Sequence, residues 1–423
     1  MILLHEEQHE VPLAEVSVVL AGGAAADPVG KEGLTAHASE LMLRGAAGRS
    51  RNDLDERLDE LGASLDASVS MDAVAWSGRC LSRHLPALCE LLADALGRPD
   101  LAKSEHDKLV REELAQLDDA LDDDGTLAAR WFDRLALAGH PYARPSGGTK
   151  ASLASLTRDG ARAWATQRLG QAGLLVGFAG DVDAGTARSL AAGLAAALPG
   201  RAETMPTPGA PIPRHGRRTV IVDKPERTQS QILIGGPAPA RSDPDFIPLI
   251  VAAAIFGGTF TSRLMTEVRV KRGWSYGASC SVGRGRTGAT TRLHLHPSGE
   301  QTPKAIALVL RLWREIVDGG VTRAELELVR GWLRGRWAFE LDTPGKRLDR
   351  RIDALHLGLP NDDLATFPTR VAEVTRAEVD AAMRRWWHPE DASIVVTATA
   401  RDLVPRLKRL ALGELAIVAY DAD

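Results

Sequence analysis

The amino-acid sequence predicts an α+β protein with two homologous domains, in each of which helices pack on a mostly antiparallel sheet. Three observations support this prediction. The 423 residues exceed what one ordinary hydrophobic core organises. The chain also repeats itself weakly with a period of about 219 residues, as two copies of one domain would. In each copy, strands come first, long helices follow, and a strand comes last.

The elements of the two copies match in order. An early apolar strand at 16–20 precedes a helix that begins near Leu34, and a second such strand at 231–234 precedes a helix near Pro248. The later matches are a charged helix and a late apolar strand in each copy: 109–111 with 328–330, and 174–178 with 393–397. Both copies therefore predict the same fold.

A proline-rich connector separates the copies. Proline lacks the N–H that helices and sheets need, so such a segment is typical of a stiff linker. The connector contains Pro206, Pro208, Gly209, Pro211, Pro213 and Gly216. We predict an N-terminal domain at 1–205, a linker at 206–217 and a C-terminal domain at 218–423.

Composition limits the partners that the protein could have. The net charge of −4 and the pI near 6.3 give no electrostatic reason to expect nucleic acid or an anionic membrane. The first residues lack the regions of a signal peptide, and charges interrupt the alanine-rich stretches well below membrane-spanning length. Cys80, Cys89 and Cys280 form no C-x-x-C pair and are interpreted as reduced thiols. We expect a cytoplasmic protein without nucleic-acid or membrane partners.

Two histidine patterns suggest metal sites but have simpler interpretations. His5 to His9 formally matches the H-E-x-x-H signature, which requires both histidines on one face of a helix. Pro12 and strand-like flanks instead favour a polar hairpin turn. His294 and His296 share one face of a strand, without a third ligand nearby in the sequence.

The segment from His37 to Leu41 resembles the inverted motif H-x-x-E-H, with leucine in place of the second histidine. Leucine cannot bind zinc. His37 with one carboxylate, from Glu112 or Glu113, leaves fewer than the three protein ligands of a catalytic zinc. We therefore predict no metal on this chain and interpret His37 as a half-buried helical residue beside a solvated Glu40.

Several further segments, taken in order along the chain, resemble those of the pitrilysin/insulinase-type (inverzincin) metallopeptidases. The similarity is greatest to the short bacterial two-domain branch related to mitochondrial processing peptidase. It covers nearly the whole length and is carried by residues 33–34, 44–45, 61–63, 140–145, 148–149, 179–182, 229–231, 257–258, 262–264 and 269–276. The resemblance implies two domains arranged as a clam-shell, with zinc on one half and an arginine and a tyrosine on the facing half.

Family members place H-x-x-E-H between the equivalents of Gly33 and Arg44. Aligned in this way, Ala36, Ser39 and Glu40 take the ligand, base and ligand positions, and His37 falls one place off. The resemblance therefore implies a dismantled zinc motif. Its degenerate positions are Ala36, His37, Ser39, Glu40 and Leu41, with Glu112 on the second helix.

The C-terminal feature of the family is retained. Arg269 and Tyr276 match the arginine and tyrosine that contact the substrate beside the cleaved bond in family members. Arginine supplies forked donors for peptide carbonyls, and tyrosine can donate to a developing oxyanion. The resemblance thus implies a non-catalytic subunit of a heterodimeric zinc metallopeptidase. Such a subunit is inactive alone and supplies these two side chains to a peptide substrate.

On this hypothesis the chain holds no cofactor of its own, and Zn²⁺ is expected on a homologous partner subunit. Two alternatives remain open. One is a structural or peptide-docking subunit that makes no catalytic contribution and uses a sheet edge near 64–70. The other is an active homodimeric zinc peptidase that uses His37, Glu40 and Glu112.

Overall fold

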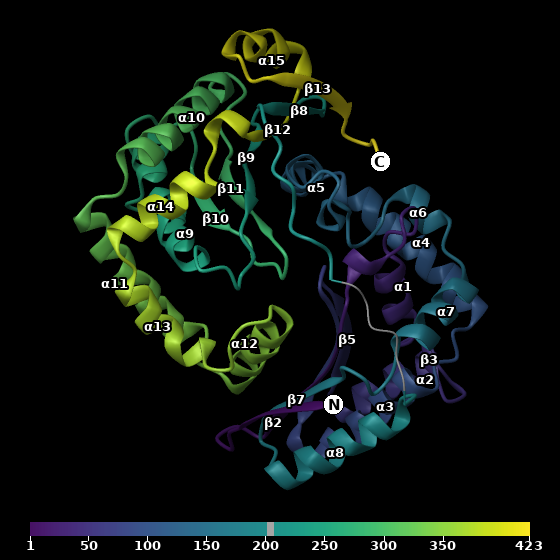
Figure 1. The fold of residues 1–423 in the computed structure, drawn as a ribbon. Helices are drawn as coiled ribbons and strands as arrows, with labels where there is room; N and C mark the ends of the chain where they lie inside the picture. Colours follow the sequence, from purple (N-terminus) through teal and green to yellow (C-terminus); the bar gives the residue numbers. More distant parts are fainter. Residues whose placement is uncertain (201–206) are drawn as a thin grey trace. The chain divides into compact units, whose positions relative to one another are not determined.

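The computed structural model describes residues 1–200 and 207–423 (Figure 1). Residues 201–205, assigned above to the N-terminal domain, and Pro206, the first residue of the predicted linker, lie outside the described residues. The chain forms two compact units. The first comprises Met1–Leu117, Pro145–Thr207 and Ala338–Leu364, and the second comprises Asp118–Arg144, Pro208–Trp337 and Ala365–Asp423.

The first unit contains a five-stranded sheet in the order β1-β7-β2-β6-β5. β1 runs parallel to β7, and the other neighbouring strands are antiparallel. The strands are β1 (Ile2–Glu7), β2 (Leu13–Ala21), β5 (Ser64–Val69), β6 (Ala73–Leu81) and β7 (Leu175–Gly180), and a separate two-stranded ribbon consists of β3 (Gly45–Ala46) and β4 (Arg49–Ser50).

Both faces of this sheet bury apolar side chains. On β2, Val16, Val18 and Leu20 face a core shared with α1, α3, α7 and α8, whereas Val19 faces α12. The helices of the unit are α1 (Leu34–Leu41), α2 (Arg51–Leu61), α3 (Leu85–Gly97), α6 (Lys150–Ala154), α7 (Arg158–Arg168), α8 (Ala184–Ala197) and α12 (Pro344–His356).

The second unit contains a six-stranded sheet in the order β10-β11-β9-β12-β8-β13. β8 runs parallel to β12 and β13, and the other neighbours are antiparallel. The strands are β8 (Arg218–Asp223), β9 (Gln231–Ala238), β10 (Ala278–Val282), β11 (Ala289–Leu295), β12 (Ser393–Ala398) and β13 (Glu414–Ala419). Apart from β13, strand order and direction repeat those of the first unit. The predicted α+β fold with mostly antiparallel sheets is confirmed.

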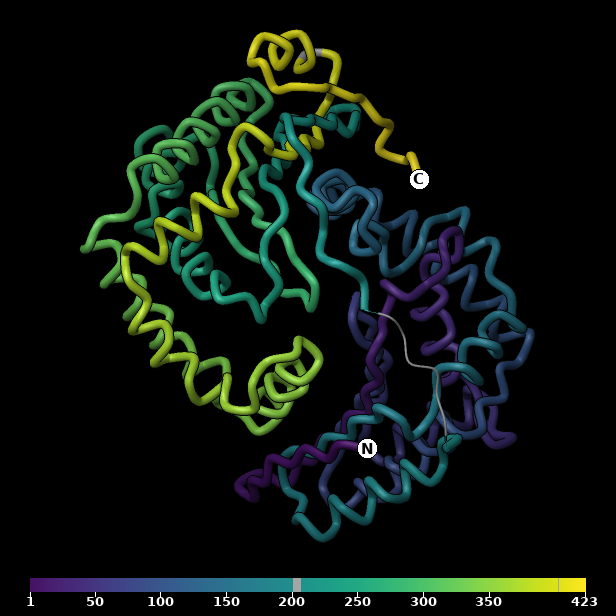
Figure 2. Tube along the Cα trace, viewed as in Figure 1, coloured from purple at the N-terminus to yellow at the C-terminus, as the bar shows by residue number. Residues whose placement is uncertain are grey.

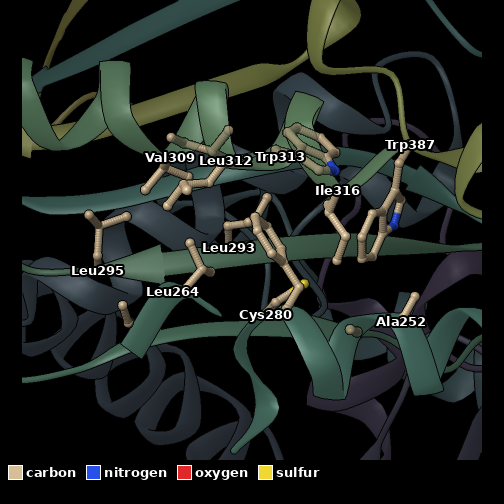
Figure 3. Packing of buried hydrophobic residues seen from close by; sticks show 14 of the residues in the cluster. Ala252, Leu264, Cys280, Leu293, Leu295, Val309, Leu312, Trp313, Ile316 and Trp387 are labelled. Atoms are coloured by element: carbon tan, nitrogen blue, oxygen red, sulfur yellow. The ribbon is translucent and has the colours of Figure 1, made fainter. Parts of the chain in front are cut away.

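Aromatic side chains, among them Trp313 and Trp387, lie in the core of the second unit (Figure 3). The ring of Trp387 lies 5.8 Å from that of Phe256 and 6.2 Å from that of Trp313, and its Nε1 donates to Thr291 Oγ1 at 3.1 Å. The helices of the unit are α5 (Asp124–Ala136), α9 (Phe246–Ala253), α10 (Thr302–Gly319), α14 (Arg376–Trp386) and α15 (Ala400–Leu407). Three more helices include residues of both units: α4 (Lys103–Ala120), α11 (Arg323–Phe339) and α13 (Asp363–Glu373).

Each half of the sequence contributes one helix to the sheet of the other half (Figure 2). α5, from the first half, lies on β8, β9 and β12, where the ring of Phe132 is fully buried among the valine and leucine side chains of these strands. Polar contacts reinforce this packing. Lys224 Nζ, at the end of β8, lies 2.7 Å from Asp124 Oδ1, and Arg292 Nη2, on β11, donates to Asp133 Oδ1 at 2.6 Å.

The reciprocal helix, α12, comes from the second half and covers β1 and β7. Leu348 packs there with Leu4 and Leu175. An added Cβ at Gly177 of β7 would lie 2.7 Å from Leu348 Cδ1, so the glycine makes room for this side chain. Glu6 of β1 accepts hydrogen bonds from Arg347 and Arg351 of the same helix, at 3.0 and 2.7 Å.

Candidate functional site

The sequence singled out two regions, one in each unit. The first is the degenerate motif on α1. This helix begins at a fixed point because the buried carboxylate of Asp27 caps it. Oδ2 accepts from the Gly33 N–H at 3.0 Å, and Oδ1 accepts from the Thr35 N–H and hydroxyl at 3.0 and 2.6 Å. Gly33 itself has a positive φ of 91°. Asp27 was missed in the sequence because it lies seven residues before the helix starts.

The positions that align with the motif carry no metal-binding chemistry. Ala36 has no polar side-chain atom. Ser39 is buried, and its hydroxyl donates to the carbonyl oxygens of Thr35 and Ala36, at 2.7 and 3.0 Å. Leu41 belongs to the apolar core of the unit. The serine hydroxyl is therefore used within its own helix and cannot act as a general base.

His37 is fully buried, so the interpretation as a half-buried residue was wrong. Its Nδ1 lies 2.9 Å from Glu113 Oε2, and its Nε2 lies 2.8 Å from Nδ1 of His106 on α4. Burial disfavours the charged form of His106 and lowers its pKa. Because the groups are joined end to end, the nitrogens of His37 do not converge on a point where a metal ion could lie.

Glu40 and Glu112 belong to a second network. Arg44, the third residue after α1, lies with Nε 3.3 Å from Glu40 Oε1 and Nη2 2.6 Å from Glu112 Oε2. The residues considered for a homodimeric zinc peptidase, His37, Glu40 and Glu112, are thus divided between two networks. Within residues 1–200 and 207–423, no group of three or more His, Cys, Asp or Glu side chains is placed to hold a metal ion. The residues present do not fit the zinc that the family resemblance implies.

The other histidine patterns are structural. His5 lies on β1, where Nε2 contacts Val182 O at 2.8 Å, and His9 lies 2.6 Å from Asp181 Oδ1. The strand-like flanks are confirmed, but the predicted hairpin was wrong because β7 lies between β1 and β2. His294 Nε2 pairs with Gln231 Oε1 at 2.8 Å.

The second region extends from Phe256 to Tyr276 in the second unit. Two short π-helical segments occur here, η4 (Ala254–Gly258) and η5 (Met265–Val270), and Arg269 lies on the second. Such segments are rare and are frequent at functional sites. Gly273, with a φ of 62°, forms the turn that leads to Tyr276 and β10.

The structure brings Arg269 and Tyr276 together. The guanidinium carbon of Arg269 lies 4.6 Å from the centre of the Tyr276 ring and 5.9 Å from that of Phe260. Both rings are largely exposed, at 79% for Tyr276 and 80% for Phe260. A cation this close to an aromatic ring is attracted by the negative charge of the ring face. Phe260 was missed in the sequence, where nothing distinguishes it from a buried phenylalanine.

Arg269 differs from the neighbouring basic residues in having no ion pair with the described residues. Glu267 pairs with both Lys271 and Arg272, at 2.6 Å in each case, and these hydrogen bonds lower the pKa of Glu267. Arg269 instead has no hydrogen bond or ion pair from its side chain to any residue that the structure describes. Its five N–H donors are therefore available to a ligand.

A partly buried ion pair lies near the start of this region. Arg263 donates to Glu325 through Nε and Nη2, at 2.7 and 2.8 Å. Partial burial is the largest single influence and opposes ionisation of Glu325, but the hydrogen bonds from Arg263 and Thr322 together outweigh it and lower its pKa to about 2. The bidentate geometry fixes Arg263, two residues before η5 begins.

We expect Glu325→Gln to lower the free energy of unfolding by about 1–2 kcal/mol at pH 7, after allowance for solvent screening of this partly exposed pair. Because the folded pKa lies below the ordinary value of 4.5, the contribution is present above pH 4.5 and is lost as the pH falls toward 2. Urea unfolding between pH 7 and about pH 3.5 should show the two proteins converging. Glu315→Gln, in the exposed pair with Arg311, is the control and should have little effect at any pH.

Gly257 allows η4 to approach β10. An added Cβ would lie 2.3 Å from Cys280 N, whereas one at Gly258 would lie 3.2 Å from Ala254 Cβ. We expect Gly257→Ala to lower the free energy of unfolding by about 1–3 kcal/mol and Gly258→Ala to change it by less than about 1 kcal/mol. Equal effects in denaturant unfolding would show that the close approach is not what matters.

Two further observations concern the cysteines and the helices. Cys80, Cys89 and Cys280 are free and buried, and burial raises the pKa of Cys80 to about 11 and that of Cys89 to about 12. None of the helices in the described ranges combines the length and the apolar character needed to cross a lipid bilayer.

Two family models match the sequence. The model described as Insulinase (Peptidase family M16) matches residues 2–135, and the model described as Peptidase M16 inactive domain matches residues 155–331. Together they cover most of the chain and include both regions described above.

Individual proteins are similar over most of their length. A Mycobacterium tuberculosis protein named as an uncharacterized zinc protease is 26% identical over 355 residues, which cover 81% of this chain and 79% of the relative. A Helicobacter pylori protein named as a non-peptidase homolog is 20% identical over 401 residues, covering 94% and 92%. A crystal structure from Pseudomonas fluorescens, described as a peptidase M16 inactive domain, has a TM-score of 0.84 at 24% identity and covers 93% of this chain and 95% of its own.

Proposed function

Because the chain belongs to peptidase family M16 as a non-catalytic member, we propose that it is the helper subunit of a heterodimeric zinc peptidase. In this proposal a homologous partner carries the zinc. Arg269 and Tyr276 of this chain bind and polarise the peptide substrate at the partner's active site. The chain alone cleaves nothing.

One observation carries the proposal. Among the basic residues of the turn, Lys271 and Arg272 are neutralised by Glu267, whereas Arg269 makes no ion pair with the described residues and is held between two exposed rings. A guanidinium that lies over two exposed aromatic rings, and has no acceptor among the described residues, can direct its N–H donors to a ligand. The N–H donors of Arg269 can therefore bind a ligand from outside the chain.

The two side chains suit an extended peptide. The guanidinium fork of Arg269 can donate to backbone carbonyl oxygens, and contacts with two rings restrict the motion of the side chain, which reduces the entropy lost on binding. Tyr276 is 79% exposed. Its hydroxyl can donate a hydrogen bond to a peptide oxygen that gains negative charge as the bond is cleaved. Neither group requires a metal on this chain.

The first unit supports the same division of labour. Ala36, Ser39 and Glu40 occupy the ligand and base positions of the family motif, and none is placed to bind zinc or activate water. A peptidase built on this chain would need its metal from another subunit, and a homologue with an intact H-x-x-E-H motif is the simplest source.

The test is reconstitution. The chain is co-expressed with each homologue from the same genome that carries H-x-x-E-H, and complexes are identified by size-exclusion chromatography with light scattering. Cleavage of a library of internally quenched peptides is then measured for each chain alone and for the pair. We expect activity in the pair only. Stoichiometric zinc on the purified chain, or full activity of the homologue alone, would contradict the proposal.

A peptide-docking subunit without a catalytic role is the second candidate. The observation that favours it is the position of β5, which lies at the edge of the first unit's sheet and pairs with β6 alone among the described strands. An edge strand can add a peptide as a further strand. On this reading the pair would form, but substitutions at Arg269 and Tyr276 would leave cleavage unchanged.

A further inference from the structure

We infer that the guanidinium of Arg44 is a built-in cation that fills, from within the chain, a two-carboxylate site formed by Glu40 and Glu112. The family resemblance described above places Glu40 at a metal-ligand position, and Glu112 lies on α4. The carboxylates are present, but an arginine side chain lies between them instead of an ion.

The contacts place Arg44 between two helices. Its Nε lies 3.3 Å from Glu40 Oε1, at the end of α1, and its Nη2 lies 2.6 Å from Glu112 Oε2, on α4. One guanidinium therefore links the end of one helix to the middle of another, as a shared cation would.

Burial distinguishes this link from an ordinary surface ion pair. Arg44 is only 7% exposed, whereas both carboxylates are more than a third exposed. Its Nη1 is buried and has no hydrogen-bond acceptor in the described part of the chain. Burying a cation is costly unless opposite charges compensate it, so the two carboxylates are what hold the arginine in this position.

The two oxygens of Glu112 have different neighbours. Oε1 lies 3.8 Å from Arg51 and 3.9 Å from Lys108, while Oε2 faces Arg44. Removing Arg44 would free Oε2 of Glu112 and Oε1 of Glu40 together. Both are hard oxygen ligands that divalent cations such as Mn²⁺ and Ca²⁺ accept.

The experiment uses the full-length chain alone and measures no peptidase activity, so its outcome is independent of the proposed partner. Wild-type protein, Arg44→Ala and Arg44→Lys are titrated with Mn²⁺, and the free ion is measured by electron paramagnetic resonance. We expect Arg44→Ala to bind about one Mn²⁺ and to gain about 3–6 °C in melting temperature at hundredfold excess over its Kd. Wild-type protein and Arg44→Lys, which keep a cation in place, should show neither effect.

Adding Glu112→Gln to Arg44→Ala is the matched control and should abolish both the Mn²⁺ uptake and the thermal shift. If Arg44→Ala does not fold, as judged by circular dichroism, Arg44→Gln replaces it, since glutamine keeps much of the volume without the charge. A folded Arg44→Ala or Arg44→Gln that binds no more Mn²⁺ than wild-type protein would overturn the inference. So would wild-type protein that binds Mn²⁺ in a Glu112-dependent way, because the carboxylates would then be open despite the guanidinium.

Discussion

We expect Tyr276→Phe to lower the kcat of the proposed peptidase pair by about 10- to 1,000-fold, the loss expected for one donor to a developing oxyanion. The substitution removes a single oxygen atom and leaves the ring that contacts Arg269 in place. Because the hydroxyl is expected to act more strongly on the transition state than on the bound substrate, KM should change little. Steady-state kinetics with a quenched fluorescent peptide measure both constants.

Tyr420→Phe removes the same group near the end of β13 and should leave kcat unchanged. Arg269→Ala is the companion variant and should raise KM as well as lower kcat, since on the proposed function the Arg269 donors contact the substrate before and during cleavage. Stable complex formation by every variant must be shown by light scattering. A Tyr276→Phe pair with wild-type kcat would remove Tyr276 from the chemistry and favour the docking function.

Phe132→Ala lowers the free energy of unfolding by about 3–5 kcal/mol, the range for deleting a buried aromatic side chain. The ring is fully buried between α5 and the sheet of the second unit, where Val220, Val222 and Leu233 surround it. Its Cζ would lie 3.1 Å from a Cβ at Gly235, so the ring packs closely against the backbone of β9. Denaturant unfolding followed by circular dichroism gives the value.

Phe339→Ala is the control, because this phenylalanine is 70% exposed and its loss should change the free energy by about 0.5 kcal/mol or less. Leu348→Ala tests the reciprocal helix, α12, and should cost about 2–5 kcal/mol. If Phe132→Ala were as mild as Phe339→Ala, α5 would not depend on this anchor.

The strands and the duplication were predictable because they depend on local pattern. Apolar runs such as 174–178 and 393–397 fall on β7 and β12, the strands at matching places in the two sheets. Which sheet a helix covers was not predictable. The spacing of apolar residues in α5 indicates a buried face, but the partner of that face is set by side chains such as Val220 and Val395, far along the chain.

The site divides in the same way. Arg269 and Tyr276 were identified from the resemblance and do lie together, because one short turn joins them. The ring of Phe260 and the pairing of Glu267 could not be foreseen, since they depend on how two π-helical segments fold back. On α1, the sequence showed which ligands were missing. It did not show that His106 and Arg44 engage the groups that remain.

The exchange of α5 and α12 has a consequence for the origin of the chain. A gene that encoded only one repeat would yield a product whose helix equivalent to α5 or α12 packs on the sheet of another molecule. One face of its own sheet would then be exposed. In a pair of such molecules, each would have to pack this helix on the sheet of the other. If the chain arose by duplication of a single-repeat gene, the ancestral product would have needed such an exchange between two molecules. We expect the two halves of the present gene, expressed separately, to be insoluble and to regain solubility only when mixed.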